Sequence, residues 1–373
     1  MNISTVQFII LGFSAFALTG FLTWPLRAVA IRLGAMDAPN LARKTQAEPV
    51  PYLGGVAIAL GITVITFAAV FVGGNAKSEN NGQLKDLALT VLLPALVLGA
   101  MGLFDDLRSL SPWPRLITQT VVGTVVAFVI VENGTIGTPF GNGGSADSGA
   151  TGAIINGATE SGNGSWINTA VTIFWIVGIC NSINFFDNLD GAASGAVAIA
   201  ALGVFVIAFD RGQELVSALS IVTAGATIGF LMWNKSPAKI YMGDAGALFL
   251  GIVISVATIR LNPGITPTWH SLAIPVMLLA VPLLDTCVAV FSRLARGLSP
   301  LTGGKDHLSH RLVRGGFTRP MAAISLWSAS GICALFALGV YFFADSLGSI
   351  LIGLFAAVWL LALVLFLRTP SND

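Results

Sequence analysis

The chain has 373 residues, of which 55% are hydrophobic and only 10% are charged, and its formal net charge is +1. A soluble domain carries about 25% charged residues, so this chain cannot cover a water-facing surface of ordinary size. The high hydrophobicity also excludes intrinsic disorder, and the small net charge gives no reason to expect a nucleic-acid partner. We therefore expect an all-α polytopic integral membrane protein.

Eleven apolar segments are long enough to be membrane-spanning helices, because a helix needs about 20 mostly apolar residues to cross a bilayer. In chain order they are 4–24, 52–72, 86–104, 114–131, 166–184, 192–209, 214–233, 245–261, 270–292, 321–343 and 347–367. Strands of a membrane barrel would alternate apolar and polar residues, which these segments do not. We expect a single transmembrane domain over 1–373, in which the first segment is a span and not a cleaved signal peptide.

The basic residues are distributed unevenly between the loops. If the N-terminus lies outside, only four of the 19 Lys and Arg residues fall in outside segments, namely Lys77, Lys85, Arg211 and Arg260. Because basic residues gather in cytoplasmic loops, we predict an outside N-terminus and a cytoplasmic C-terminus in the cell membrane. Residues 133–165, rich in Gly, Asn and Ser, are then a flexible outside loop, and residues 293–320 are a basic cytoplasmic loop.

Two adjacent carboxylates, Asp105 and Asp106, end the third predicted span. Like charges this close resist joint ionisation unless a cation lies between them. A solvated helix end is the alternative interpretation of this pair.

A second polar cluster ends the fifth predicted span. Asn181, Asn184 and Asp187 are spaced three residues apart, so one helix face presents two amides and a carboxylate. Asp190 continues that face if the helix persists. The adjoining loop has no basic residue, and buried acids without partners are costly. A divalent cation or a polar ligand would offset this cost, and a polar loop that ends a helix is the alternative.

A third acid, Asp244, begins the eighth predicted span, and we expect it to cap that helix. The preceding Gly243 permits a tight turn or the close approach of a ligand. Two lysines nearby, Lys235 and Lys239, suit a phosphate group.

The basic loop 293–320 also holds His307 and His310, two of the three histidines of the chain. A positively charged anchor loop would explain its Arg and Lys residues but not this pair. The carboxylate and amide oxygens of the acidic motifs suit Mg²⁺, or else Mn²⁺, better than zinc. Mg²⁺ together with Lys, Arg and His is suited to handling phosphates. The chain has no Walker motif, so ATP-driven pumping is not expected.

At these motifs the sequence resembles the polyprenyl-phosphate N-acetylhexosamine-1-phosphate transferases. The matching segments are 37–44, 51–55, 105–106, 181–191, 234–246 and 307–311. The resemblance implies about ten or eleven spans and a cytoplasmic active site. It also implies transfer of a sugar 1-phosphate from a UDP-sugar to undecaprenyl or another polyprenyl phosphate, with release of UMP. This reaction would be the first membrane step of cell-envelope glycan synthesis.

The resemblance further implies roles for individual residues. Asp244 would be the principal Mg²⁺ ligand, with Asp105 and Asp187 as the other metal residues and Asp105 as the candidate base. The catalytic residues that it implies are Asp105, Asp106, Asp187, His307 and His310. The substrate-binding residues that it implies are Arg43, Lys44, Asn184, Asp190, Asn234, Tyr241 and Arg311. Of these, Tyr241 offers a ring on which uridine can stack. The chain departs from the family pattern at Gln46, where relatives often have His, and at Ser309, which interrupts a commonly denser histidine cluster.

The expected donor is UDP-N-acetylglucosamine, because 37–43 resembles that branch of the family. Its N-acetylgalactosamine epimer is an open alternative, because the two sugars differ at only one hydroxyl. The muramyl enzymes resemble one another in three consecutive histidines, which the segment 307–311 lacks. A phospho-N-acetylmuramoyl-pentapeptide transferase is nevertheless the alternative enzyme. An ion-coupled transporter using Asp285 is the alternative of another class, and it predicts acids spread through the membrane depth. A homodimer is compatible with the sequence.

Overall fold

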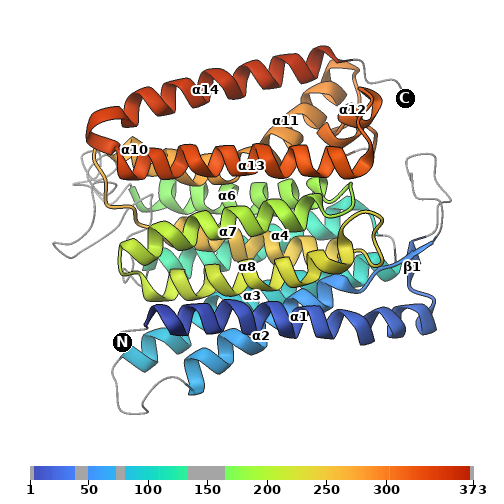
Figure 1. Ribbon diagram of the computed structural model, residues 1–373, viewed down its shortest axis with the longest axis horizontal. Helices are drawn as coiled ribbons and strands as arrows, with labels where there is room; N and C mark the ends of the chain where they lie inside the picture. The colour runs from blue at the N-terminus through green and yellow to red at the C-terminus, as the bar shows by residue number, and fades with distance from the viewer. Residues whose placement is uncertain are drawn as a thin grey trace.

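The computed structural model describes residues 4–37, 49–72, 80–108, 110–132, 164–301 and 303–369, and it confirms an all-α polytopic membrane fold. The long helices lie side by side in one bundle (Figure 1). Within the described ranges, seven helices are long and apolar enough to cross a membrane, or up to eight if a bent pair is one span. Helix is present within every segment that hydropathy predicts.

Helices make up nearly all of the regular structure. In chain order they are α1 (Thr5–Leu33), α2 (Gly54–Val72), α3 (Asn80–Arg108), α4 (Pro112–Glu132), α6 (Gly164–Phe186), α7 (Ala192–Asp210), α8 (Glu214–Asn234), α9 (Gly243–Arg260), α10 (Thr268–Leu278), α11 (Ala280–Ala295), α12 (Leu308–Arg314), α13 (Arg319–Phe342) and α14 (Ala344–Arg368). Two short strands, β1 (Met36–Asp37) and β2 (Val50–Pro51), pair antiparallel between α1 and α2.

The predicted ninth span is not one straight helix. It is broken into α10 and α11, which meet at an angle of 72°. The Leu279 N–H still bonds to the Pro275 carbonyl, and the Leu283 N–H bonds to the Leu279 carbonyl. Between these two bonds stands Pro282, which has no N–H to donate to the Leu278 carbonyl and whose ring crowds the preceding turn. The segment 270–292 is therefore a broken helix, and the bent pair together remains long and apolar enough to be one span.

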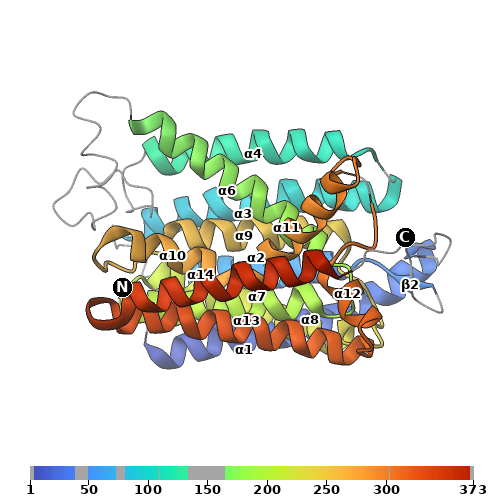
Figure 2. The same cartoon turned by 90° about the horizontal axis from the view of Figure 1, so that it is seen from above.

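The central helix of the bundle is α9, whose residues from Ala245 to Arg260 are all buried. It packs against α2, α3 and α6, and Figure 2 shows it in the middle of the molecule. Its first turn therefore opens at the centre of one end of the bundle. Any side chain on that turn is surrounded by the ends of the neighbouring helices.

Small residues bring α1 and α8 into close contact. A Cβ atom on Gly225 would lie 2.1 Å from the Gly12 carbonyl oxygen, and one on Gly229 would lie 2.3 Å from the Phe16 carbonyl oxygen. These two glycines are four residues apart, the spacing that lets membrane helices approach backbone to backbone.

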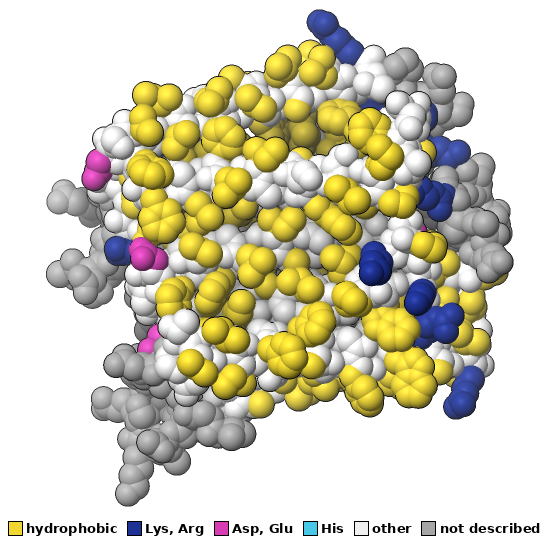
Figure 3. All heavy atoms as spheres, in the orientation of Figure 1, with side chains coloured by type: hydrophobic (Ala, Val, Ile, Leu, Met, Phe, Trp, Pro, Cys, Tyr) yellow, Lys and Arg dark blue, Asp and Glu magenta, His cyan; other side chains and the backbone are white. Residues whose placement is uncertain are grey.

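The sides of the bundle are apolar and its two ends differ in charge. Large hydrophobic side chains are exposed along the outer helices, including Leu347, Ile350 and Leu354 of α14. Lys and Arg side chains gather at one end in Figure 3. We call this end, where α1, α3, α6, α8 and α11 finish and α9 begins, the basic end. An apolar belt of this extent is suited to lipid and not to water.

Candidate active site

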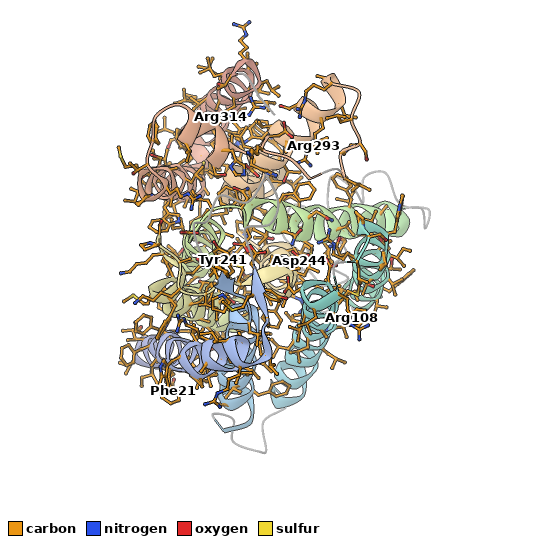
Figure 4. The ribbon with its side chains drawn as sticks, turned by 90° about the vertical axis from the view of Figure 1, so that its right-hand side faces the viewer. Phe21, Arg108, Tyr241, Asp244, Arg293 and Arg314 are labelled. Atoms are coloured by element: carbon orange, nitrogen blue, oxygen red, sulfur yellow. The ribbon has the colours of Figure 1, made fainter. Side chains whose placement is uncertain are left out.

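Four carboxylates come together at the basic end around Asp244, which Figure 4 labels near the middle of the view. Asp105 and Asp106 come from the last turn of α3, Asp187 follows α6, and Asp244 lies in the first turn of α9. We call these four residues the acidic cluster. The prediction that acids from separate motifs meet at one end of the helices is thus matched by the arrangement of the described residues.

The helices carrying the acidic cluster are in direct backbone contact. Gly243 has a φ of +67°, and a Cβ there would lie 2.4 Å from Oδ2 of Asp106. On the facing helix, a Cβ on Gly102 would lie 2.4 Å from the Asp244 carbonyl oxygen. Gly243 therefore provides the tight turn that the sequence permits, and it is the Asp106 side chain that approaches it closely. The approach of a ligand at this position stays a prediction.

The residue that caps α9 is Asp106 and not Asp244. Oδ1 of Asp106 accepts a hydrogen bond from the backbone N–H of Asp244 at 2.9 Å, and Oδ2 accepts one from Ala245 at 3.1 Å. The expectation that Asp244 caps its own helix is wrong because a carboxylate from α3 already occupies that place. The side chain of Asp244 is consequently available for other contacts.

Arg115 lies between two acids of the cluster. Its Nη1 is 2.9 Å from Oδ2 of Asp105, and the same atom also bonds to Oδ2 of Asp244. The other oxygen of Asp244 accepts a hydrogen bond of 2.7 Å from Nδ2 of Asn184. A single positive charge is thus shared by two carboxylates, one of which, Asp105, is only 7% exposed.

Asp187 has no such cation beside it among the residues that the structure describes. Its burial, followed by the charges of Asp244, Asp106 and Asp190, raises the pKa of Asp187 to about 8. Like charges and desolvation both favour the protonated carboxyl. A cation placed among these acids would reverse this effect.

The oxygen atoms of the acidic cluster are of the kind that Mg²⁺ binds. Mg²⁺ prefers oxygen ligands and is commonly held by one or two carboxylates, with waters and substrate phosphates completing the shell. Arg115 already marks a point between Asp105 and Asp244 where positive charge is needed. Among the described residues, no three His, Cys, Asp or Glu side chains form a complete ligand set. A site that relies on two carboxylates and a substrate fits this arrangement.

Two residues expected to bind the nucleotide are bonded within the protein. Nδ2 of Asn234 donates to the Ile240 carbonyl at 3.0 Å, and its Oδ1 accepts from the Gly191 N–H at 3.1 Å. Oδ2 of Asp190 accepts from the Ala238 N–H at 3.1 Å. These bonds tie the loop after α6 to the loop after α8. Asp190 does not continue the α6 face, since that helix ends at Phe186.

Tyr241 lies at the edge of the acidic cluster. Its backbone forms a bridge with Tyr52, and its N–H donates to the Pro51 carbonyl at 2.9 Å. Burial, and then the charge of Asp190, raise the pKa of the Tyr241 hydroxyl. The ring is half-buried, and its stacking on uridine stays a prediction.

The two histidines of the basic loop differ in environment. Nδ1 of His307 lies 2.7 Å from Oδ2 of Asp285, and its Nε2 lies 3.3 Å from Nη2 of Arg293. His310 is 6.2 Å from His307 between ring centroids and shows no side-chain hydrogen bond to a described residue. Burial, and then the neighbouring His307, lower the pKa of His310 to about 4.

Arg311 makes protein contacts through all three of its nitrogens. Nε donates to the Asp306 carbonyl at 2.8 Å, Nη2 donates to Oγ of Ser292 at 2.5 Å, and Nη1 bonds to the Phe366 and Thr369 carbonyls. It therefore fastens α12 to the end of α14, a role that the sequence does not suggest. Arg43, Lys44 and Gln46 lie outside the described residues.

The sequence alone does not predict that Arg115 and Asp285 bond to the polar residues at the basic end. Arg115 stands ten residues after Asp105 at the start of the next helix, where a lone arginine indicates only a membrane boundary. Asp285 enters the sequence reasoning only as part of a transport path. Its position within an apolar helix is the one sequence feature that indicates a functional role. Sequence spacing does not predict that His307 is its partner.

Comparison with known proteins identifies the family of the chain. The model of glycosyl transferase family 4 matches residues 88–262. A probable undecaprenyl-phosphate N-acetylglucosaminyl 1-phosphate transferase of Bacillus subtilis is 31% identical over 86% of this chain and 81% of its own. A decaprenyl-phosphate N-acetylglucosaminephosphotransferase of Mycolicibacterium smegmatis is 28% identical over 98% of this chain and 89% of its own. A phospho-N-acetylmuramoyl-pentapeptide-transferase of Streptococcus thermophilus is 30% identical over 57% of this chain and 59% of its own.

These matches define the chain as a membrane-bound sugar-phosphate transferase. It belongs to glycosyl transferase family 4, among the polyprenyl-phosphate N-acetylhexosamine-1-phosphate transferases. The resemblance inferred from the sequence motifs is confirmed. The transporter alternative has no support in these comparisons.

Proposed function

We propose that the chain transfers N-acetylglucosamine 1-phosphate from UDP-N-acetylglucosamine to a polyprenyl phosphate and releases UMP. The observation that carries the proposal is the acidic cluster, assembled from three separate segments at the basic end of an apolar bundle. The activities named for the Bacillus and Mycolicibacterium relatives support the same acceptor and sugar.

The proposed topology has eleven spans, with the N-terminus outside and the C-terminus in the cytoplasm. The proposed location is the plasma membrane. Its support is the basic end, because Lys and Arg residues favour the cytoplasmic side. Helices alternate in direction along the chain, so the acidic cluster lies at the same end as these residues. The donor, a soluble nucleotide sugar, would reach the cluster from the cytoplasm, and the acceptor from the bilayer.

Mg²⁺ is the proposed cofactor, with Asp244 and Asp105 as its first ligands and Asp187 nearby. When bound, it would neutralise the phosphate charge that accumulates as two anions approach. Mn²⁺ has the same preference for oxygen and is the substitute to test.

The residues of this chain then have simple tasks. A phosphate monoester has a second pKa near 6, so the acceptor phosphate is already largely ionised at neutral pH and needs little help from a base. Its oxygen attacks the β-phosphorus of the donor, and the bond from that phosphorus to the oxygen of UMP breaks. Asn184 holds the Asp244 carboxylate in place, and Asp106 holds the helix that carries it. Tyr241 would offer its ring to the uridine.

The test is a donor comparison with purified protein, Mg²⁺ and undecaprenyl phosphate. UDP-N-acetylglucosamine, its N-acetylgalactosamine epimer and the muramyl pentapeptide donor are offered separately, and labelled lipid and UMP are measured. We expect labelling from a simple N-acetylhexosamine donor. Faster labelling from the peptide donor would favour the activity named for the Streptococcus relative. The variant Asp244→Asn, handled identically, controls for contaminating activity.

A further inference from the structure

Asp285 is a fully buried acid outside the acidic cluster, and its exposed fraction is 0%. A buried carboxylate is costly unless its oxygens are bonded. Oδ1 of Asp285 accepts a hydrogen bond from the Leu308 N–H at 2.7 Å, and Oδ2 lies 2.7 Å from Nδ1 of His307. Both partners belong to the start of α12, so one acid on α11 determines where that short helix begins.

The contacts of His307 define which ring nitrogen carries the proton. A guanidinium group can only donate hydrogen bonds. Nη2 of Arg293, 3.3 Å from Nε2 of His307, therefore makes Nε2 an acceptor. The proton must then sit on Nδ1, where it is donated to Asp285. Arg293 is itself held by Oδ2 of Asp306 at 3.1 Å, so it cannot turn away freely.

The same short helix reaches the acidic cluster. Oγ of Ser309, in the first turn of α12, donates to Oδ1 of Asn188. Nδ2 of Asn188 donates to the Phe185 carbonyl at 2.6 Å. Asn188 directly follows Asp187, so the position of α12 and the position of that acid are linked. The ring of Phe185 also meets the edge of the His307 ring, with 6.0 Å between centroids.

We propose that Asp285 is a positioning residue that holds His307 as the Nδ1–H tautomer and, through α12 and Asn188, sets the place of Asp187. In this assignment His307 is a positioning residue as well, since both of its nitrogens are bonded within the protein. The effect on catalysis rests on the proposed function of the acidic cluster. The assignment of the His307 tautomer is independent of that function.

The tautomer is tested by nitrogen NMR of protein labelled at histidine. The chain has only three histidines, so His307 is assigned by its loss in His307→Asn. We expect a protonated Nδ1 and an unprotonated Nε2. In Asp285→Asn the Nδ1 resonance should move, because an amide offers one acceptor oxygen where two are needed. An Nε2–H tautomer, or an unchanged spectrum in Asp285→Asn, would overturn the proposal whether or not the protein turns over.

The positioning role is tested by comparing two replacements of His307. The amide nitrogen of His307→Asn can donate to Asp285 as Nδ1 does, and His307→Ala cannot. We expect His307→Asn to stay within about tenfold of the parent kcat. His307→Ala and Asp285→Asn should lose about 100-fold, the usual cost of an acid displaced by about 1 Å. If His307→Asn is as inactive as His307→Ala in folded protein, the imidazole itself is catalytic and the proposal fails.

The matched control is Asp210→Asn, which removes a carboxylate bonded to the Tyr341 hydroxyl at the opposite end of the bundle. It should retain parent turnover. Folding of each variant is checked by gel filtration and by its unfolding temperature. If Asp285→Asn does not fold, the two His307 variants decide the outcome. If the parent protein transfers no sugar phosphate, the proposed function fails while the NMR result still judges the tautomer.

Discussion

Asp106 uses both of its carboxylate oxygens to hold the first turn of the helix that carries Asp244, 138 residues further along the chain. The bonds go to the backbone N–H groups of Asp244 and Ala245, at the positively polarised end of α9. Asp106 thereby stabilises the start of α9, and the side chain of Asp244 remains available to face a ligand. The adjacent Asp105, with its different partner Arg115, is not part of this cap.

The cap predicts a combined loss of stability and activity in Asp106→Asn. An amide keeps one acceptor but loses the charge and the second bond, so the free energy of unfolding should fall by about 1 kcal/mol. Turnover should fall as well, because Asp244 is placed by the same turn. Thermal unfolding and UMP release measure the two effects. Asp345→Asn, at the exposed first turn of α14, is the control, and parent turnover in Asp106→Asn would contradict the assignment.

Asp244→Asn should leave the protein folded and abolish turnover. Asp244 is 27% exposed, its backbone is held by Asp106, and its side chain faces Arg115 and Asn184. The change is nearly isosteric, and it removes the negative charge and one of the two acceptor oxygens. Asp105→Asn and Asp187→Asn should also lose several orders of magnitude. Full activity of Asp244→Asn at saturating Mg²⁺ would exclude it as a metal ligand.

Arg115→Met should make the protein depend on a divalent cation for its stability. The substitution removes the only charge shown between Asp105 and Asp244 among the described residues. Two facing carboxylates without a cation are unfavourable, so the variant should unfold at a lower temperature than the parent in EDTA. Saturating Mg²⁺ should restore most of the difference. Arg108→Met, which removes an exposed arginine near the same helix end, should show no such rescue.

The sequence predicts which residues gather at this end, because hydropathy locates the helices and basic loops orient them. Asp105, Asp187 and Asp244 then lie at the same end without any knowledge of tertiary contacts. Their division of tasks depends on packing between distant segments. The cap on α9 joins residues 138 apart, and Asp244 is bonded to Asn184 across 60 residues. No local spacing carries that information.

The same limit explains the expectations that differ from the structure. Arg311 lies beside two histidines, which suggests a ligand, yet the end of α14 comes within its reach only in the folded chain. The bend between α10 and α11 has a local cause in Pro282. Pro282 is visible in the sequence, but it lies within a continuous apolar run, and hydropathy alone therefore predicts one uninterrupted helix.

The raised pKa of Asp187 predicts that the stability of the metal-free protein depends on pH. Its pKa is raised from 3.8 to about 8 in the folded protein, so the folded state binds this proton more tightly than the unfolded chain. Stability should therefore fall as the pH rises from about 4 to 8 and change little above that. Unfolding temperatures in EDTA between pH 5 and 9 measure the trend, and Asp187→Asn should weaken it. Burial also raises the pKa of Asp105 to about 6 and that of Asp106 to about 7, so these two acids account for the remainder. A rise in stability over this range that depends on Asp187 would contradict the assignment.

The affinity of the protein for Mg²⁺ should also depend on pH, and it should rise as the pH rises. Binding requires ionised carboxylates, so it displaces the proton of Asp187, and the apparent affinity should increase up to about pH 8. Titration calorimetry in two buffers of different ionisation enthalpy would detect the released proton. Affinity that does not vary with pH would mean that Asp187 is remote from the metal.

The segment between α4 and α6 should be dispensable for catalysis. Predicted as an outside loop over 133–165, it lies mostly outside the described residues, and α6 begins at Gly164. Its flanking helix ends are informative: α4 starts near Asp105 and ends at Glu132, and α6 starts at Gly164 and ends next to Asp187. Both junctions with the segment are therefore at the end of the bundle opposite the acidic cluster.

Replacement of residues 133–163 by a Gly/Ser linker of roughly ten residues tests this prediction, since such a linker is flexible enough to join the two helices. UMP release per folded protein should stay within about twofold of the parent, because no part of the acidic cluster is altered. The unfolding temperature separates a helix-packing defect from a catalytic one. The matched comparison is a variant in which the same length of sequence is kept but its order is shuffled. A tenfold loss in both variants, with unchanged unfolding temperature, would show that this segment acts in the reaction and that the topology is misassigned.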